Sequence, residues 1–262
     1  MNAAVFHGDG ARMREIADGE AAVVFTGPPY FPPAIEPRLR EPVRAQRHFE
    51  AVQRELFAFA LALRPVFVEI RRVLSPGGVL ILQTKDVRYG GHLVAVAATH
   101  RQLAESTGLA LVTRVLWEPM FQQVSQRVRT RDGGAVRFRV RETEEFLVFA
   151  DPRERRRGVT QQLPQQEMEE CIGPVWRVPG VGGGARHPHQ SPAGVVRRLL
   201  LLHSIPGDLV VDPFAGGGGI LAVAVRLGRR AMGYDIDRAH VDLAASAVAR
   251  AQAARRRSGG GE

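Results

Sequence analysis

The segment LVVDPFAGGGGILAVAVRLGRRAMGYDID, residues 209–237, decides the fold expected for this chain. A short apolar run ends in Asp212, a run of four glycines follows, and a second apolar run ends in Asp235. Glycines at such a turn let the backbone approach a bound ligand closely, and an acid at the end of the next strand accepts hydrogen bonds from ribose hydroxyls. Gly216 and Asp235 are 19 residues apart, as expected for one strand–helix–strand unit. The segment therefore predicts a site for a nucleoside cofactor.

The glycine pattern by itself is compatible with three explanations of this turn. A turn with only a structural role and the dinucleotide site of a dehydrogenase would both have similar glycines. Asp212, Pro213 and Phe214, which directly precede the turn, favour a third explanation, because a buried-strand acid suits a site that holds a cation. The sulfonium and amino group of S-adenosylmethionine form such a cationic ligand.

A second stretch, VVFTGPPYF at residues 23–31, has the pattern of a buried strand that ends in a proline corner. Proline fixes its own φ and restrains the residue before it, so Pro28 and Pro29 hold the backbone in one conformation at the strand end. Tyr30 follows directly. The stretch predicts a fixed backbone carbonyl beside an aromatic ring.

The remaining pattern predicts an α/β fold, in which a mostly parallel sheet has helices on both faces. Strands are expected at residues 21–26, 79–83, 109–117, 135–140, 146–150, 209–212 and 230–234. Helices are expected at residues 43–74, 92–107, 192–203, 220–227 and from 238 onward. We expect the first helix to break before Pro65. Residues 151–189 lack periodicity and are rich in Arg, Gln, Gly and Pro, which indicates an insertion or loop.

With DPFAGGGG and TGPPY in one chain, the sequence resembles the β-class, or permuted, amino-methyltransferases of DNA, which methylate N4 of cytosine or N6 of adenine. HGDG at residues 7–10, RRVLSPGGVLIL at 71–82, ETEEFLVFA at 142–150 and RHPHQSP at 186–192 resemble further family segments. The catalytic motif comes first and the cofactor motif last, which is the order of the β group. The resemblance implies a circularly permuted, Rossmann-like methyltransferase fold.

The resemblance also implies roles for individual residues. It implies S-adenosylmethionine as cofactor, bound by Asp9, Gln190, Ser191, Asp212, Pro213, Phe214, Gly216, Gly218 and Asp235. Its catalytic motif falls on Gly27, Pro28, Pro29 and Tyr30. In the family, the target base is swung out of the duplex, and its amino protons are accepted by the first proline's carbonyl and by the preceding side chain. Tyr30 would stack on the base.

Gly27 departs from the family pattern, which has Asp, Asn or Ser at this place. Loss of one preorganised hydrogen bond to a transition state costs on the order of 10²–10³ in rate. Three hypotheses remain: an active enzyme in which Thr26, a water or another loop supplies the acceptor, a weakened or inactive enzyme, and a corner without catalytic meaning. The nearest family variant, Thr-Ser-Pro-Pro-Tyr, favours cytosine N4 over adenine N6.

The charge balance favours a polyanionic partner, because the 262 residues have a formal net charge of +9. Lys85 is the only lysine among the basic residues. QRVRTRDGGAVRFRVR at residues 126–141 predicts a hairpin whose alternating arginines form either a phosphate-binding face or a solvated one. The residues predicted to contact double-stranded DNA are Arg127, Arg129, Arg131, Arg137, Arg139, Arg155, Arg156 and Trp176.

The resemblance divides the chain into parts of one methyltransferase domain. Residues 1–150 would form the catalytic half, 151–186 a short target-recognition insertion, 187–254 the cofactor half and 255–262 a disordered tail. A single cysteine, Cys171, excludes a disulfide framework and a cysteine-cluster metal site. His187 and His189 lack a third ligand nearby, so no metal is expected. No apolar run approaches the ~20 residues of a membrane span, and the N-terminus lacks a signal-peptide layout, which predicts a cytoplasmic protein.

The function predicted is a site-specific DNA methyltransferase of the restriction-modification kind that acts on cytosine N4, as a monomer or homodimer. Adenine N6 of DNA is the first alternative, and an amino group of guanosine in RNA is the second. A DNA-binding module with a vestigial methyltransferase core is the third, for which Gly27 is the main reason. A dehydrogenase is the least favoured, because nothing at the Pro-Pro-Tyr corner serves hydride transfer.

Overall fold

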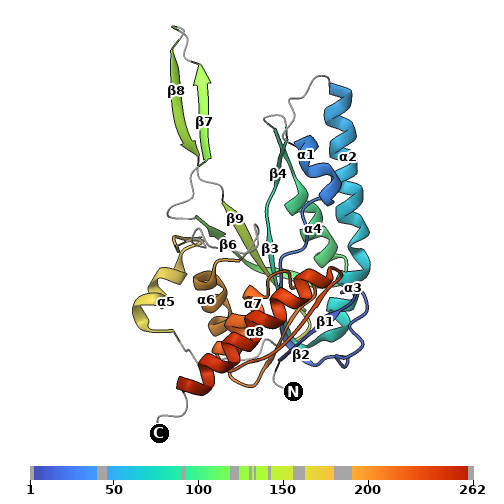
Figure 1. Cartoon of the computed structure of the whole chain (residues 1–262), viewed down its shortest axis with the longest axis vertical. Helices are drawn as coiled ribbons and strands as arrows, with labels where there is room; N and C mark the ends of the chain where they lie inside the picture. Colours follow the sequence, from blue (N-terminus) through green and yellow to red (C-terminus); the bar gives the residue numbers. More distant parts are fainter. Residues whose placement is uncertain are drawn as a thin grey trace.

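The computed structural model of the chain describes residues 3–39, 46–89, 92–118, 124–129, 132, 134–140, 143–155, 163–179 and 191–258. Its main sheet has the strand order β1-β12-β11-β2-β3-β9-β6-β10 (Figure 1). These strands are β1 (Ala3–His7), β2 (Ala21–Thr26), β3 (Leu74–Thr84), β6 (Ala110–Trp117), β9 (Glu144–Ala150), β10 (Val175–Trp176), β11 (Leu209–Asp212) and β12 (Arg230–Asp235). Neighbouring strands are parallel except at β9, which is antiparallel to both β3 and β6. The predicted mostly parallel sheet is confirmed.

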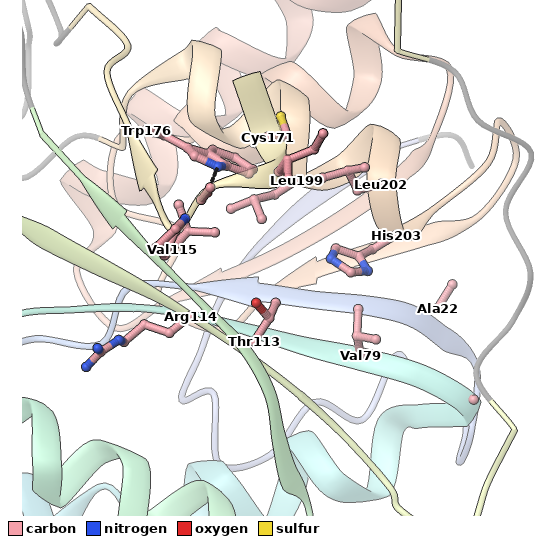
Figure 2. Close-up of a pocket in the computed structure, with 14 residues that line it drawn as sticks. Ala22, Val79, Thr113, Arg114, Val115, Cys171, Trp176, Leu199, Leu202 and His203 are labelled. Carbon is pink, nitrogen blue, oxygen red and sulfur yellow. Dashed lines mark hydrogen bonds between the residues drawn. The ribbon is translucent and has the colours of Figure 1, made fainter. Parts of the chain in front are cut away.

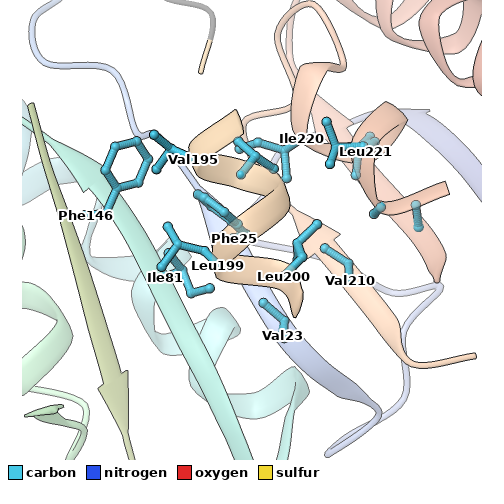
Figure 3. Close-up of a cluster of buried hydrophobic side chains, with 14 of the residues drawn as sticks. Val23, Phe25, Ile81, Phe146, Val195, Leu199, Leu200, Val210, Ile220 and Leu221 are labelled. Atoms are coloured by element: carbon cyan, nitrogen blue, oxygen red, sulfur yellow. The ribbon is translucent and has the colours of Figure 1, made fainter. Parts of the chain in front are cut away.

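Two layers of helices cover the sheet. One layer contains α6 (Ala193–His203), α7 (Gly219–Arg226) and α8 (Arg238–Ser258), and the other contains α3 (Arg64–Val73) and α4 (Val96–Glu105). Side chains of a strand point alternately to opposite faces, so Val23 and Phe25 pack towards α6 and α7 (Figure 3) while Val24 packs towards α3 and α4. Because both faces are covered, all six residues of β2 are buried, which explains why it reads as a continuous apolar run.

A third hydrophobic cluster lies beyond the carboxyl end of β2. It joins Tyr30 to α2 (Gln46–Ala62) and to the small hairpin of β4 (Val87–Tyr89) and β5 (His92–Val94). The short elements η1 (Pro33–Ile35) and α1 (Glu36–Leu39) lead into it. The expected break before Pro65 is confirmed, because α2 ends at Ala62 and α3 starts with that proline in its first turn.

The order of the strands differs from their order in the chain. Strands β11 and β12, from the C-terminal part of the chain, lie between the N-terminal strands β1 and β2. From β11 the chain continues outward to β12, and from β2 it continues outward to β3 on the opposite side. In open parallel sheets, such a reversal between neighbouring strands opens a crevice at their carboxyl ends, where ligands bind.

Three expected boundaries are wrong. Residues 163–179 contain α5 (Gln165–Ile172) and β10, and β10 extends the main sheet beside β6, so this part of the expected irregular insertion has regular structure. Residues 92–94 are a strand rather than the start of a helix, because they pair with β4. Residues 255–258 continue helix α8, so the expected disordered tail does not begin at residue 255.

A second hairpin projects away from the main sheet (Figure 1). It consists of β7 (Val124–Arg129) and β8 (Ala135–Val140), and its register places Arg127 opposite Arg137. It emerges between β6 and β9, at the edge where Trp117 of β6 pairs with Glu144 of β9. The predicted arginine-rich hairpin is therefore present, and it leaves the sheet at the carboxyl end of β6.

Gly218, which precedes α7, offers a test of the packing at the glycine turn. Its φ of +73 lies in the left-handed region, and a Cβ there would lie 2.6 Å from the Cα of Ala244 in α8. Gly207 also has a positive φ, but nothing lies within 4 Å of its Cβ position. We expect Gly207→Ala to cost about 1–2 kcal/mol of unfolding free energy through its backbone alone. Gly218→Ala should cost more, because α8 must also shift. Urea unfolding of both variants measures the difference, and equal losses would contradict this packing.

Candidate active site

One buried hydrogen bond joins the two motifs at the centre of the site. Thr26, the last residue of β2, donates from Oγ1 to Oδ1 of Asp212, the last residue of β11, over 2.7 Å. The same carboxylate oxygen accepts the backbone N–H of Phe214 at 3.1 Å. Both side chains are buried, Thr26 at 0% and Asp212 at 2% exposure. The bond holds the carboxyl end of β2, where the Pro-Pro-Tyr corner begins, against the end of β11, where the glycine turn begins.

Burial has a marked effect on the Asp212 carboxyl. Desolvation raises its pKa to about 7, and the nearby Asp235 carboxylate adds to the rise, while the hydrogen bonds from Thr26 and Phe214 oppose it. A carboxyl group in this state gains charge near neutral pH. A cationic ligand beside it would favour the ionised form.

The acid at the end of β12 supports the glycine turn directly. Asp235 accepts the backbone N–H of Gly216 through Oδ2 and that of Asp237 through Oδ1, each at 2.9 Å. The imidazole of His240 lies 3.4 Å from Oδ1. These contacts hold the carboxylate at the carboxyl end of β12, directly beside the turn that carries Gly216 and Gly218.

The loop after β1 closes over the same edge. Register pairs His7 with Asp235, and the next residue, Gly8, donates its N–H to the Asp235 carbonyl at 3.0 Å. Gly10 packs so tightly on the cofactor motif that a Cβ would lie 2.7 Å from the carbonyl oxygen of Pro213. Asp9 is exposed, and its carboxylate accepts the N–H of Ala11 at 2.9 Å.

Most residues predicted to bind a cofactor therefore gather at one edge of the sheet. The strand ends and turns that meet there carry Asp9, Asp212, Pro213, Phe214, Gly216, Gly218 and Asp235. Ser191 lies further along the same edge, beside Gln83 at the carboxyl end of β3, which is two strands from β11. Gln190 lies outside the described residues. The roles of these residues in binding remain predictions.

The Pro-Pro-Tyr corner lies on the same edge, at the carboxyl end of β2. Pro28 is buried, Pro29 is exposed and Gly27 is half-buried. Neither backbone nor space demands a glycine at position 27. Its φ is not among the positive values, and a Cβ would meet Gln83 at ordinary contact distances of 3.7–3.9 Å.

A cluster of polar side chains surrounds the corner. Gln83 is only 3% exposed, and its side-chain N–H₂ donates to Glu144 while its Oε1 accepts from the hydroxyl of Ser191. Glu144 forms an ion pair with Lys85 at 3.5 Å. The cluster joins the end of β3, the start of β9 and the residue that leads into α6.

Tyr30 is enclosed on several sides in this structure. The residue is 7% exposed, and the Lys85 ammonium lies 5.5 Å from the centroid of its ring. Burial, and then the Glu144 carboxylate, raise the pKa of the phenol well above its ordinary value. The ring of His100 also lies near Tyr30, with the two ring centroids 6.4 Å apart, and its Nδ1 shares a hydrogen bond with the Thr84 hydroxyl at 2.9 Å. Burial lowers the pKa of His100 to about 4, so the ring is neutral at pH 7.

The sequence pattern did not identify Gln83, Glu144 or His100 as part of the site. For Gln83 the sequence did contain a signal, because it is a polar residue at the end of a continuous apolar strand, VLILQT at residues 79–84. The connection between Gln83 and Glu144 depends on the antiparallel pairing of β3 with β9, which brings residues 61 positions apart together.

The residues predicted to contact DNA have different outcomes. Trp176 is a core residue: it is 2% exposed, and its indole N–H donates to the Gly173 carbonyl at 3.2 Å. The prediction that Trp176 contacts DNA is therefore wrong. Arg155 is exposed. Arg127, Arg129, Arg137 and Arg139 lie in the projecting hairpin, and Arg131 and Arg156 lie outside the described residues.

A cavity of about 550 Å³ lies away from this edge (Figure 2). It is lined by residues of β2, β3, β6 and α6 and by the segment that includes Cys171 and Trp176. No residue of the Pro-Pro-Tyr corner or the glycine turn lines it. The cavity therefore does not contribute to the candidate site.

Other ligand classes find little support in the described part of the chain. It contains no group of three or more His, Cys, Asp or Glu side chains that would hold a metal ion, and His187 and His189 fall outside it. Among the helices of that part, none combines the length and the apolar character needed to cross a membrane.

The fold and the site together define a Rossmann-like methyltransferase, with a glycine turn and a Pro-Pro-Tyr corner on one sheet edge. Residues 21–246 match the protein family described as DNA methylase, the N6 and N4 methyltransferases. The match begins at the first residue of β2 and ends within α8, so it includes both motifs. The chain belongs to this family of DNA amino-methyltransferases.

Individual relatives agree with this assignment. M.MjaI of Methanocaldococcus jannaschii, a type II methyltransferase, is 24% identical over 90% of this chain and 88% of that protein. TTHA0409 of Thermus thermophilus, described as a DNA modification methylase, has a TM-score of 0.69 at 26% identity, over 95% of this chain and 94% of that one. The cytosine-N4-specific PvuII DNA methyltransferase has a TM-score of 0.67 at 16% identity, over 100% and 94% of the two chains, which shows the shared fold.

The raised pKa of Asp212 predicts a specific pH dependence of stability. A carboxyl whose pKa is raised on folding stabilises the folded state at low pH, and this contribution is lost as pH rises from about 4 to about 7. Asp212→Asn keeps an acceptor for Thr26 and removes the ionisation. Between pH 5 and pH 8 the wild type should lose unfolding free energy relative to this variant, on the order of 1–4 kcal/mol. Urea unfolding at both pH values measures the loss. Asp242→Asn, at an exposed carboxylate, is the control, and parallel profiles for all three proteins would contradict the prediction.

Proposed function

We propose that the protein binds S-adenosylmethionine and transfers its methyl group to an exocyclic amino nitrogen of a base in double-stranded DNA, with cytosine N4 favoured over adenine N6. The Thr26–Asp212 hydrogen bond carries this proposal, because it holds the Pro-Pro-Tyr corner directly beside the glycine turn. Methyl transfer requires a bound methyl donor and an acceptor nitrogen side by side, and these two motifs would hold them.

The sheet edge that carries Asp212, the glycine turn and Asp235 has hydrogen-bonding and charged groups that suit S-adenosylmethionine. Asp235 lies at the end of β12 with its carboxylate anchored to Gly216, where it can accept hydrogen bonds from ribose hydroxyls. Asp212 offers a buried acid whose ionisation a cationic ligand would favour. TTHA0409 has been solved in complex with S-adenosyl-L-methionine, and it is 24% identical to this chain over 96% of both chains. When bound, this cofactor supplies an electrophilic methyl group.

The corner would serve the target base. The lone pair of an exocyclic amino group is delocalised into the ring, so the nitrogen becomes a better nucleophile when its protons are held by acceptors. The carbonyl of Pro28 is the first such acceptor. The ring of Tyr30 is the stacking surface for a flipped base, and Lys85, which lies over that ring, would have to move when the base enters.

The DNA would lie along the carboxyl edge of the sheet. The net charge of +9 favours phosphate binding, and the hairpin of β7 and β8 leaves the sheet near the corner. Arg127, Arg129, Arg137 and Arg139 of the hairpin and the exposed Arg155 would contact the backbone. The type II methyltransferases among its relatives support a role in restriction-modification.

A second candidate function is a DNA-binding module without methyltransferase activity. Gly27 favours it, because this residue provides no side-chain acceptor. Such a module would bind DNA and cofactor without turnover.

The first experiment incubates the purified protein with tritium-labelled S-adenosylmethionine and duplex DNA of mixed sequence. Digestion of the DNA to nucleosides should reveal label in N4-methylcytosine. Label in N6-methyladenine would correct the base. Absence of label from DNA, with label in a tRNA control, would replace the substrate with RNA. Cofactor binding without transfer to either would favour the inactive module.

The cofactor site is tested separately by calorimetry. Asp235→Ala removes the carboxylate that is held beside the glycine turn, and we expect it to weaken S-adenosylmethionine binding tenfold or more, since a charged hydrogen bond contributes about 1.5–3 kcal/mol. Asp242→Ala, at an exposed position of α8, should bind the cofactor as the wild type does. Equal affinities for the two variants would place the ribose elsewhere.

A further inference from the structure

The register of the sheet places Gln83 next to the position where the family's side-chain acceptor is missing. Thr26 of β2 pairs with Leu82 of β3, so the residues that follow, Gly27 and Gln83, are neighbours. A Cβ on residue 27 would lie 3.7 Å from Cβ and 3.8 Å from Oε1 of Gln83. The glycine therefore leaves space between the corner backbone and the amide of Gln83.

The contacts of Gln83 determine which way its amide points. A carboxylate only accepts hydrogen bonds, so the bond to Glu144 directs the amide nitrogen to that side. The oxygen then lies on the other side, where the Ser191 hydroxyl donates to it. A carbonyl oxygen has two lone pairs, so Oε1 keeps the capacity for a second donor. Gln83 is 3% exposed, and its amide is hydrogen-bonded at both ends before any base arrives.

Other polar groups near the corner fit the role of acceptor less well. The Thr26 hydroxyl donates its proton to Asp212 and is 0% exposed. The Nε2 of His100 has no hydrogen-bond partner among the described residues, but the ring is fully buried and lies 6.4 Å from that of Tyr30, centroid to centroid. Glu144 accepts from Gln83 and pairs with Lys85. Among these groups of the described residues, Gln83 alone combines a preset oxygen with a position next to residue 27 in the sheet register.

We propose that the side-chain oxygen of Gln83, held by Glu144 and Ser191, accepts the amino proton that residue 27 would otherwise accept, so that the catalytic acceptor has moved from β2 to β3. This inference rests on the proposed function. Its chemistry is the same as that of an Asn at residue 27, since both are amide oxygens.

The acceptor acts on the electrons of the amino group. With one proton held by the Pro28 carbonyl and the other by Gln83 Oε1, the nitrogen lone pair is less delocalised into the ring. The nitrogen forms the new N–C bond with this pair while the S–C bond of the methyl donor breaks towards sulfur, which keeps the bonding electrons. One amino proton then leaves to water, and the methylated amine is neutral.

The test compares Gln83→Leu with Gln102→Leu, an exposed glutamine of α4. Methyl transfer to mixed-sequence duplex DNA should fall by roughly 100-fold or more in kcat for Gln83→Leu and stay unchanged for Gln102→Leu. Calorimetry with S-adenosylmethionine should give the same affinity for both variants and the wild type, and urea unfolding shows whether each is folded.

The double variant Gln83→Ala with Gly27→Asn returns an amide oxygen to residue 27. It should regain at least tenfold in kcat over Gln83→Ala, which a merely structural role for Gln83 would not produce.

The outcomes separate this inference from the proposed function. If the wild type methylates DNA and Gln83→Leu retains more than a third of its kcat, the inference is wrong and the function stands. If the wild type is inactive and Gly27→Asn or Gly27→Asp creates activity, Gln83 does not replace the missing acceptor, which also overturns the inference. If all these proteins bind the cofactor and none transfers methyl to DNA, the function and the inference both fail.

Discussion

The hydrogen bond between Thr26 and Asp212 is the interaction on which the site depends. It joins residues 186 positions apart and connects the carboxyl ends of β2 and β11. These are the two neighbouring strands from which the chain continues towards opposite sides of the sheet. Its partners are the last residues of their strands, so each motif begins directly after an anchored atom. With both side chains buried, water does not compete for the bond, and the raised pKa of Asp212 reflects the cost of that burial. The corner and the glycine turn cannot drift apart without breaking it.

The environment of the corner is assembled from several strands rather than from one motif. Residue 27 contributes only backbone, while β3 contributes Gln83, β9 contributes Glu144 and the entry to α6 contributes Ser191. Lys85 balances the carboxylate and covers the Tyr30 ring. A site of this kind depends on the register of β3 against both neighbours, because a slip of one residue would turn Gln83 to the opposite face. The sequence of the Pro-Pro-Tyr corner alone therefore does not reveal all of the polar side chains that surround it.

The sequence predicted the strands β2 and β11 at their observed bounds, because each is a short apolar run that ends in a polar or conformationally distinctive residue. The cofactor edge followed from the same reasoning. Residues 92–94 were missed because their strand exists only through pairing with β4. Trp176 was misplaced because it lies in a short stretch interrupted by Pro and Gly, while its burial depends on pairing with β6, some sixty residues earlier, and on packing in the same cluster as α6. Gln83 was missed for a similar reason: its partners are set by register, which one strand's sequence does not contain.

The position of β11 and β12 between β1 and β2 has a consequence for synthesis on the ribosome. The N-terminal part of the chain emerges first, but β1 has no sheet neighbour until β12 is made, and one edge of β2 stays open until β11, which begins at Leu209, has emerged. During that interval the nascent chain presents an apolar strand with unpaired backbone groups, the kind of edge that promotes association between chains. Completion of the sheet is therefore a late, long-range event, and the yield of folded protein in a cell should depend on how long nascent chains are shielded from one another.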